Sequence, residues 1–388
     1  MASIDVIGPD GTRIAPDGRG GRRAPAPKGS RYIVRYRTPE GHSRMRSFAR
    51  RVEAEQFLAT TEHRKASGEY VDASAGRVTF AAYATAWAAA QPHRASTAAS
   101  VEGILRSHAL PVFGTRQIAT IRTSEIQAWI AGLELAPSTV AVVYGKVAAI
   151  FRAAEEDRVI ARSPCTRRIR LPRPPGGEVV PMTPEQVRAM VEAVSERYGA
   201  LVILLAGSGL RPGEALGLTI DRVDFLRRTI RVDRQLVTVP NEPPRFGPVK
   251  TTSSVRTIPV PQVALDELAR HLEHHSPGPH GLIFTDGKSD PIRRNALGHI
   301  WRRAAARAGV EGFTPHDLRH YAASVLIDQG ASVKAVQRHL GHASATTTLD
   351  TYAHLWPESE EVTRQALSAG LARVVLPVCY PGSAEAAK

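Results

Sequence analysis

A basic, proline-rich segment at residues 158–175 divides the chain into two blocks. It holds six arginines, no acidic residue, and Pro164, Pro172, Pro174 and Pro175. Proline continues neither a helix nor a central strand, so no regular element can run through this segment. The 388 residues also exceed what one ordinary core encloses. We therefore predict several domains, with residues 159–175 as a linker. The positive charge of this linker would allow it to wrap around a polyanion. An ordinary linker that happens to be basic is the alternative.

The net charge of +14 favours a polyanionic partner such as DNA. Only seven of the 51 basic residues are lysines, a bias that GC-rich coding also produces. Two cysteines are too few for a disulfide framework or a cysteine zinc site. The N-terminus lacks the apolar run of a signal peptide, and the apolar stretch at 200–206 is too short to span a bilayer. We expect a cytoplasmic protein, at the nucleoid if the source is bacterial.

The block before the linker contains three predicted segments. Residues 1–27 are rich in glycine and proline and predict a flexible lead. Residues 28–75 predict a small basic module, with strands at 31–37 and 43–48 and a helix at 52–66. Its eight basic residues between Lys28 and Arg51 suit DNA, although a solvated strand face is the alternative.

Residues 78–158 predict a helical domain. Phe80, Tyr83 and Trp87 recur at helical spacing, and such a stripe is more typical of a core than of a base-stacking platform. Thr123 or Ser124 is expected to cap one helix, and Ser138 to begin a longer one.

Residues 176–370 predict a mixed α/β domain, followed by a tail at 371–388. Thr183 and Gln186 form a capping-box pattern at its first helix. Strands are expected at 229–233 and 256–260, flanking a loop that contains Lys250. The histidines at 271, 274, 275 and 280 are typical of a solvated helix end and loop.

Polar residues that could perform chemistry occur in four separate segments of this last domain. In residues 207–217, a glycine turn presents Arg211, and Glu214 follows one helical turn later, where its carboxylate could hold the guanidinium. A positioned arginine is a phosphate clamp or, alternatively, one half of a structural ion pair.

In residues 314–320, Thr314 is a plausible cap, so His316 lies in the first turn with Arg319 on the same face. The positive end of a helix disfavours imidazolium, which leaves His316 able to accept a proton and leaves the helix terminus favourable to phosphate.

In residues 340–354, a glycine turn presents His342, and Tyr352 follows in a polar context that is unusual for a buried structural tyrosine. Lys250 is the fourth element. Each of the four alone is a weak signal.

Together these segments resemble the tyrosine recombinase (phage integrase) family over residues 78–370, with GLRxGE, a hairpin lysine, HDLRH, and LGH followed by TxxxY in the family's order. The resemblance is to phage or mobile-element integrases with an N-terminal arm-binding module. It implies a multidomain, mainly α fold: an arm-DNA-binding-like module at 28–75, a helical core-binding domain at 78–158, and an α+β catalytic domain at 176–370. It also implies a catalytic set, with Glu214 in a supporting role: Arg211, Lys250, His316, Arg319, His342 and Tyr352.

The resemblance implies that Tyr352 attacks a phosphate and forms a 3′-phosphotyrosyl bond. Arg211 and Arg319 would stabilise the transition state, His316 could take the tyrosine proton, His342 would bind the phosphate, and Lys250 would protonate the departing 5′-oxygen. No metal, ATP or other cofactor is expected. The implied partners are double-stranded attachment-site DNA and a homotetramer, with an accessory bending or excision factor compatible with the pattern. A helix at 358–373 and the apolar run 374–378 are expected to pack on a neighbouring protomer.

Three other functions stay open. His316 and His320, with three further histidines nearby, could ligate zinc in a metal-dependent nuclease, although HExxH and a carboxylate or thiolate cluster are absent. A DNA-binding regulator without catalysis would use the same fold. A topoisomerase of the same tyrosine chemistry would relax DNA without site preference.

Overall fold

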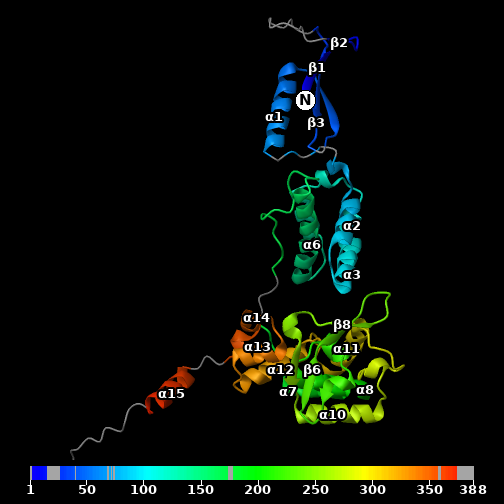
Figure 1. The fold of residues 1–388 in the computed structure, drawn as a ribbon. Coiled ribbons are helices and arrows are strands. Elements are labelled where there is room, and N and C mark those ends of the chain that lie inside the picture. Colours follow the sequence, from blue (N-terminus) through cyan, green and yellow to red (C-terminus); the bar gives the residue numbers. More distant parts are fainter. Residues whose placement is uncertain are drawn as a thin grey trace, which may run out of the picture. The chain divides into compact units, whose positions relative to one another are not determined.

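The computed structural model of the chain separates into two compact units, Met1–Gly176 and Gly177–Lys388 (Figure 1). It describes residues 2–14, 27–39, 41–67, 70, 72, 75–173, 178–356 and 360–373. No helix in these ranges is long and apolar enough to cross a membrane.

The first unit begins with an antiparallel sheet of order β2-β1-β3-β4, packed beside helix α1. Its elements are β1 (Ser3–Ile7), β2 (Arg13–Ile14), β3 (Arg31–Arg37), β4 (Ser43–Phe48) and α1 (Arg51–Ala66). The hairpin of β3 and β4 matches the prediction, with Val34 opposite Arg46. Alternation explains the two faces: Val34 is buried, whereas Arg35 and Arg37 are exposed.

The flexible lead predicted for residues 1–27 is wrong for its first half, because β1 pairs along β3 and β2 pairs with β1. The buried Asp5 explains why: its carboxylate forms ion pairs with Arg13 on β2 and Arg35 on β3, at 2.5 and 2.8 Å. The remainder of the predicted lead, residues 15–26, lies outside the described residues.

Residues 75–160 fold into helices around one core, as predicted. The helices are α2 (Phe80–Ala90), α3 (Ala95–Ile104), its π-helical continuation (Leu105–Ala109), α4 (Leu110–Phe113), α5 (Thr123–Ala131) and α6 (Pro137–Glu156). Phe80 lies against Phe113 and Phe151 in the centre of this core, and Tyr83 and Trp87 pack at its margin. The aromatic stripe is therefore core. The cap expected at Thr123 or Ser124 is wrong, because Arg122 is the N-cap residue of α5, and α6 begins at Pro137, one residue before the expected Ser138.

The first part of the predicted linker is held to this helical core. Ile169 and Leu171 pack against it, and Gln127 on α5 makes two hydrogen bonds with the backbone of Arg170. A linker can therefore begin only after this anchored stretch, nearer the boundary between the two units.

The second unit combines helices with two small sheets around a large core, and a smaller apolar cluster joins α12, α13 and α14. Its helices are α7 (Pro184–Ala193), α8 (Glu196–Ser208), α9 (Pro212–Leu216), α10 (Gln262–His274), α11 (Arg294–Ala308), α12 (Asp317–Asp328), α13 (Val333–Leu340), α14 (Ala345–Tyr352) and α15 (Glu360–Leu371). Its strands are β5 (Val223–Asp224), β6 (Thr229–Val232), β7 (Arg234–Val237), β8 (Arg245–Pro248) and β9 (Arg256–Pro259). With the small N-terminal sheet and the helical region before it, the predicted fold class is confirmed.

The predicted strands of this unit are β6 and β9, which pair with each other through Ile230 and Ile258. The hairpin of β7 and β8 lies between them in the chain and was not predicted. Thr183 and Gln186 form the predicted capping box of α7. Helix α15 falls within the predicted helix 358–373, whereas the apolar run 374–378 lies outside the described residues.

His271 corrects the expectation of a solvated histidine cluster. It lies on the inward face of α10, is 5% exposed, and its Nε2 contacts the carbonyl of Ile283 at 3.2 Å. The spacing of Ala264, Leu268 and His271 on one helical face explains this burial.

Candidate active site

A left-handed turn between α8 and α9 positions Arg211. Gly209 ends α8 with φ of 62°, and a Cβ on it would lie 2.9 Å from Leu340, so the turn needs glycine. Arg211 is the N-cap residue of α9, and its Nη1 donates to Glu214 Oε1 at 2.8 Å. The predicted pairing of this arginine with Glu214 is confirmed.

Glu214 joins two arginines in the interior. Its side chain is 3% exposed, and it accepts hydrogen bonds from Arg211 and, through both carboxylate oxygens, from Arg256 on β9. Burial by itself would raise the pKa of Glu214, but the hydrogen bonds and charges of Arg256 and Arg211 outweigh it and lower the pKa.

Arg256 was not among the predicted site residues. Its side chain is 7% exposed. Arg256 lies two residues before the buried Ile258 on β9, and because alternate side chains of a strand share a face, both lie on the inward face. That alternation is the signal that could have identified it, because a cation on the inward face of a strand needs a buried partner.

Arg319 on α12 is the largest fully buried side chain in the described part of the chain. Its Nη1 donates to the carbonyl of Gly209 at 2.7 Å and its Nη2 to that of Leu340 at 2.6 Å. Burial, and next the charge of Arg211, lower the pKa of Arg319 to about 9, so the guanidinium remains protonated at neutral pH.

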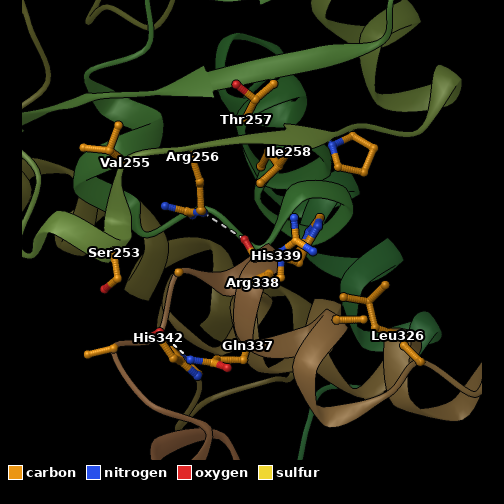
Figure 2. A pocket seen from close by; sticks show the side chains of 15 residues that line it. Ser253, Val255, Arg256, Thr257, Ile258, Leu326, Gln337, Arg338, His339 and His342 are labelled. Carbon is orange, nitrogen blue, oxygen red and sulfur yellow. Dashed lines mark hydrogen bonds between the residues drawn. The ribbon is translucent and has the colours of Figure 1, made fainter.

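The carboxyl end of α13 holds all three guanidinium groups. Its successive carbonyls at His339, Leu340 and Gly341 accept, in that order, from Arg256, Arg319 and Arg211. Figure 2 shows Arg256 directed toward the His339 carbonyl at the edge of a pocket between β9 and α13. These are carbonyls that a helix leaves without an internal partner, at the negative end of its dipole. Three arginine side chains therefore meet at this helix end. Among the described residues, Glu214 is the one carboxylate that forms ion pairs with any of them.

His342 follows this helix end. Its Nδ1 contacts the hydroxyl of Thr348 at 2.9 Å, and Thr348, which was not among the predicted site residues, is fully buried. Burial, followed by the charge of Arg319, lowers the pKa of His342 to about 4. The ring is therefore neutral at pH 7, and when Nδ1 accepts the Thr348 hydroxyl, Nε2 carries the proton and can donate.

His316 precedes α12 as its N-cap residue, two residues later than the cap predicted at Thr314. Desolvation first, and then the charges of His320 and Arg319, lower its pKa, in the direction expected from the helix terminus. The ring keeps an exposed face, so water moderates this effect. Within the described ranges, its imidazole has no hydrogen-bond partner and is open to a ligand.

Tyr352 is buried, contrary to the polar context of its sequence neighbours. The side chain is 1% exposed and packs with Ala323, Ile327 and other apolar residues, while Asp350 and Thr351 lie on outer faces of α14. Its hydroxyl oxygen lies 2.8 Å from Nδ1 of His320, within hydrogen-bond distance, and its ring stacks on His342 with centroids 6.3 Å apart. Burial raises the pKa of Tyr352 to about 12, although Arg319 opposes the rise.

Lys250 is exposed two residues after the end of β8, and it makes no hydrogen bond or ion pair with other described residues. Its loop is nevertheless connected to the site, because Thr251 bonds the Ser254 hydroxyl at 2.8 Å and Ser254 accepts from Arg211 at 3.2 Å. The structure therefore brings together Arg211, Glu214, Arg319, His342 and Tyr352, with His316 reaching them through its ring contact with His320, and leaves Lys250 on an adjoining loop.

Comparisons with known proteins agree with this geometry. Residues 181–358 match the phage integrase family, and residues 79–133 match the N-terminal SAM-like domain of phage integrases. The integrase of Mycobacterium phage D29 is 25% identical over 335 residues, which cover 82% of this chain and 88% of that protein. The tyrosine recombinase XerA of Thermococcus kodakarensis is 31% identical over 186 residues, or 47% of this chain and 60% of that protein.

Two solved structures resemble the fold. The Tn1549 transposon integrase in complex with transposon right end DNA has a TM-score of 0.65 at 22% identity, over 76% of this chain and all of that one. A lambda integrase tetramer bound to a Holliday junction has a TM-score of 0.54 at 16% identity, over 81% of this chain and 94% of that one.

Proposed function

This chain belongs to the phage integrase family of tyrosine-type site-specific DNA recombinases, and we propose that it breaks and rejoins DNA strands through a 3′-phosphotyrosyl bond to Tyr352. The observation that carries the proposal is the imbalance of charge beside the tyrosine. Arg211, Arg256 and Arg319 converge there, and among the described residues Glu214 is the one carboxylate that forms ion pairs with any of them. Buried charge of one sign is costly, so this arrangement favours an anionic ligand.

A DNA phosphate fits this position. Arg319 and Arg211 each retain N–H groups beyond those used within the protein, because a guanidinium has five. Those groups can bind the non-bridging oxygens of a phosphodiester and stabilise the pentacoordinate transition state. The open ring nitrogens of His316 and the Nε2 of His342 add two neutral donors.

The reaction conserves the phosphodiester energy. The Tyr352 Oη–phosphorus bond forms while the bond from phosphorus to the 5′-oxygen breaks, and we assign Lys250 to protonate that oxygen. Attack by the released 5′-hydroxyl of a partner strand then reverses the step and frees the tyrosine. Strand exchange of this kind integrates or excises a mobile DNA element, in the direction set by the DNA sites supplied.

A nicked duplex that carries candidate sites from beside the gene tests the proposal. Cleavage next to the nick releases a short fragment, so the protein–DNA adduct accumulates and is separated by denaturing electrophoresis. We expect an adduct from the natural chain, with or without EDTA, and from Tyr198→Phe, a half-buried control tyrosine of the same unit. Tyr352→Phe should bind DNA without forming an adduct.

The other outcomes separate the remaining functions. Binding without any adduct from the natural chain identifies a DNA-binding regulator, and loss of cleavage in EDTA identifies a metal-dependent nuclease. Relaxation of plasmids that lack the sites identifies a topoisomerase.

We also propose that residues 28–75, together with β1 and β2, bind arm-type DNA sites. The β3 face opposite Val34 carries Arg31, Arg35 and Arg37, all exposed. Asp5 holds Arg35 in place through its ion pair, which fixes the spacing of the cations. Arg31→Ala should weaken binding to a duplex of the flanking repeats while leaving adduct formation on the nicked core site unchanged.

A tetramer on two DNA sites is the proposed assembly, as in the lambda integrase complex with a Holliday junction. Leu367 and Leu371 on helix α15 are exposed. We propose that a neighbouring protomer buries these apolar side chains in the assembly. Replacement of Leu367 and Leu371 by serine, or removal of the residues after 373 with the apolar run 374–378, should reduce tetramer formation more than binding to a single site. Unchanged tetramer assembly would refute this part.

A further inference from the structure

His320 lies against the hydroxyl oxygen of Tyr352, which is the nucleophile in the proposed reaction. Its Nδ1 lies 2.8 Å from the hydroxyl oxygen of Tyr352, and the ring centroids are 5.5 Å apart at an angle of 62°. His320 was noticed in the sequence only as a potential zinc ligand. In the folded chain, the side chain that the structure places against the phenol is His320.

A neutral imidazole suits this hydrogen bond. Burial, as the largest cause, and the charge of Arg319 lower the pKa of His320, although Asp317 opposes them, so the neutral ring is favoured. In the tautomer with its proton on Nε2, the Nδ1 lone pair accepts from the Tyr352 hydroxyl, which is the arrangement that proton transfer requires. Tyr352 is 1% exposed, so water has little access to its hydroxyl.

The groups that surround His320 come from three parts of the chain. His316, Asp317 and Arg319 lie on or next to its own helix, Tyr352 on α14, and His342 on the turn before α14, within electrostatic range of the ring. The exposed His316 stands at a ring-centroid distance of 5.2 Å from His320, on the side that reaches solvent. Asp317 offers a negative charge for an imidazolium formed at His320.

We propose that His320 is a catalytic residue that accepts the proton of Tyr352 as the phenolic oxygen attacks phosphorus. The inference rests on the proposed function and deepens it. As the bond from Oη to phosphorus forms and the bond from phosphorus to the 5′-oxygen breaks, the proton moves from Oη to Nδ1. The departing oxygen takes its proton from a separate donor, assigned to Lys250, and in the reverse step the imidazolium returns its proton to the leaving phenolate. His316 is thereby released to bind the phosphate.

The substitution His320→Asn separates proton transfer from positioning. An asparagine amide oxygen can occupy the place of Nδ1 and accept the tyrosine hydrogen bond, but it cannot take up the proton. In a single-turnover assay with the nicked duplex, we expect His320→Asn to form the adduct about 10²–10⁴-fold more slowly than the natural chain. His320→Ala, which removes the acceptor as well, should be at least as slow.

Two altered reactants identify the defect as loss of a base. Replacing Tyr352 by 3-fluorotyrosine lowers the pKa of the phenol, so we expect it to speed the His320→Asn chain by about tenfold and the natural chain much less. DNA with a 5′-bridging sulfur has a leaving group that needs no proton. This DNA should restore the rate of adduct formation in Lys250→Ala. It should not restore the rate in His320→Asn, because the defect of that variant lies at the attacking oxygen.

The outcomes are distinguishable. If His320→Asn reacts at the natural rate, or if the bridging sulfur restores it, His320 is not the base and the inference is overturned. If the natural chain forms no adduct, or if Tyr352→Phe forms one, the proposed function itself fails. Urea midpoints and single-site DNA affinity confirm that each variant is folded, and His320→Ala with fluorotyrosine provides the same comparison if the asparagine variant unfolds early.

Discussion

Substitution of Glu214 by glutamine should destabilise the second unit strongly. Glu214 is 3% exposed and accepts hydrogen bonds from the backbone and side chain of Arg211 and from both terminal nitrogens of Arg256. Glutamine keeps the shape but removes the charge, and its amide nitrogen then faces a guanidinium that also only donates.

Removing one partner of a buried ion pair costs about 3–5 kcal/mol, because the remaining charge is left without compensation. Two cations lose their counter-charge here, but Arg211 is 23% exposed and water offsets part of its loss. We therefore expect Glu214→Gln to lower the free energy of unfolding of this unit by about 3–5 kcal/mol.

Urea unfolding measures this loss when it is followed by the fluorescence of Trp301, in the core of the second unit, in a chain whose other three tryptophans are replaced by phenylalanine. Glu273→Gln, on the exposed face of α10, is the matched control and should stay within about 0.5 kcal/mol of the natural chain. Cognate DNA should reduce the loss, since a phosphate supplies negative charge to the same arginines. A Glu214→Gln chain as stable as its control would refute the account of these cations.

Three further predictions concern the same site. Lys250→Ala should slow adduct formation about 10²–10⁴-fold in single-turnover kinetics, with DNA affinity unchanged; an unchanged rate would remove Lys250 from the proposed mechanism. Because the folded pKa of His342, about 4, is below its unfolded value near 6.5, its neutral form contributes stability above pH 6.5 that is lost as the pH falls toward 4. Between pH 7.5 and 5.0, the free energy of unfolding should therefore fall by about 2 kcal/mol less in His342→Gln than in the natural chain, as measured by urea titrations; equal losses would contradict the assignment. Gly209→Ala should destabilise the chain more than Gly330→Ala in thermal melts, because both have positive φ but only the first meets Leu340, at 2.9 Å; equal effects would show that the close approach is unimportant.

The motifs that the sequence reveals are those in which local structure fixes the geometry. A glycine turn, Arg211 and Glu214 lie within one short stretch, so their pairing follows from helical spacing. The strands at β3, β4, β6 and β9 follow from alternation and turn residues in the same way.

Contacts between distant segments account for what the sequence did not reveal. Alternation along β9 indicates that Arg256 faces inward, but its bond to the end of α13 and the contact of His320 with Tyr352 form only when distant elements meet, and no spacing along the chain encodes these partners. The burial of Tyr352 depends on which face of α14 turns inward, and its polar sequence neighbours suggested the opposite. The lead strand β1 was missed because Asp5, a poor strand former, is stabilised there by arginines from two other strands.

The identity of the residue that carries the DNA tests the central claim most directly. Adduct formed on the nicked duplex is digested with trypsin and nuclease, and the nucleotide-bearing peptide is sequenced by mass spectrometry. The account predicts a nucleotide linked through its 3′-phosphate to Tyr352, and a released strand whose 5′-hydroxyl can be phosphorylated by a kinase. A link to another residue, or cleavage that leaves a 5′-phosphate, would contradict it.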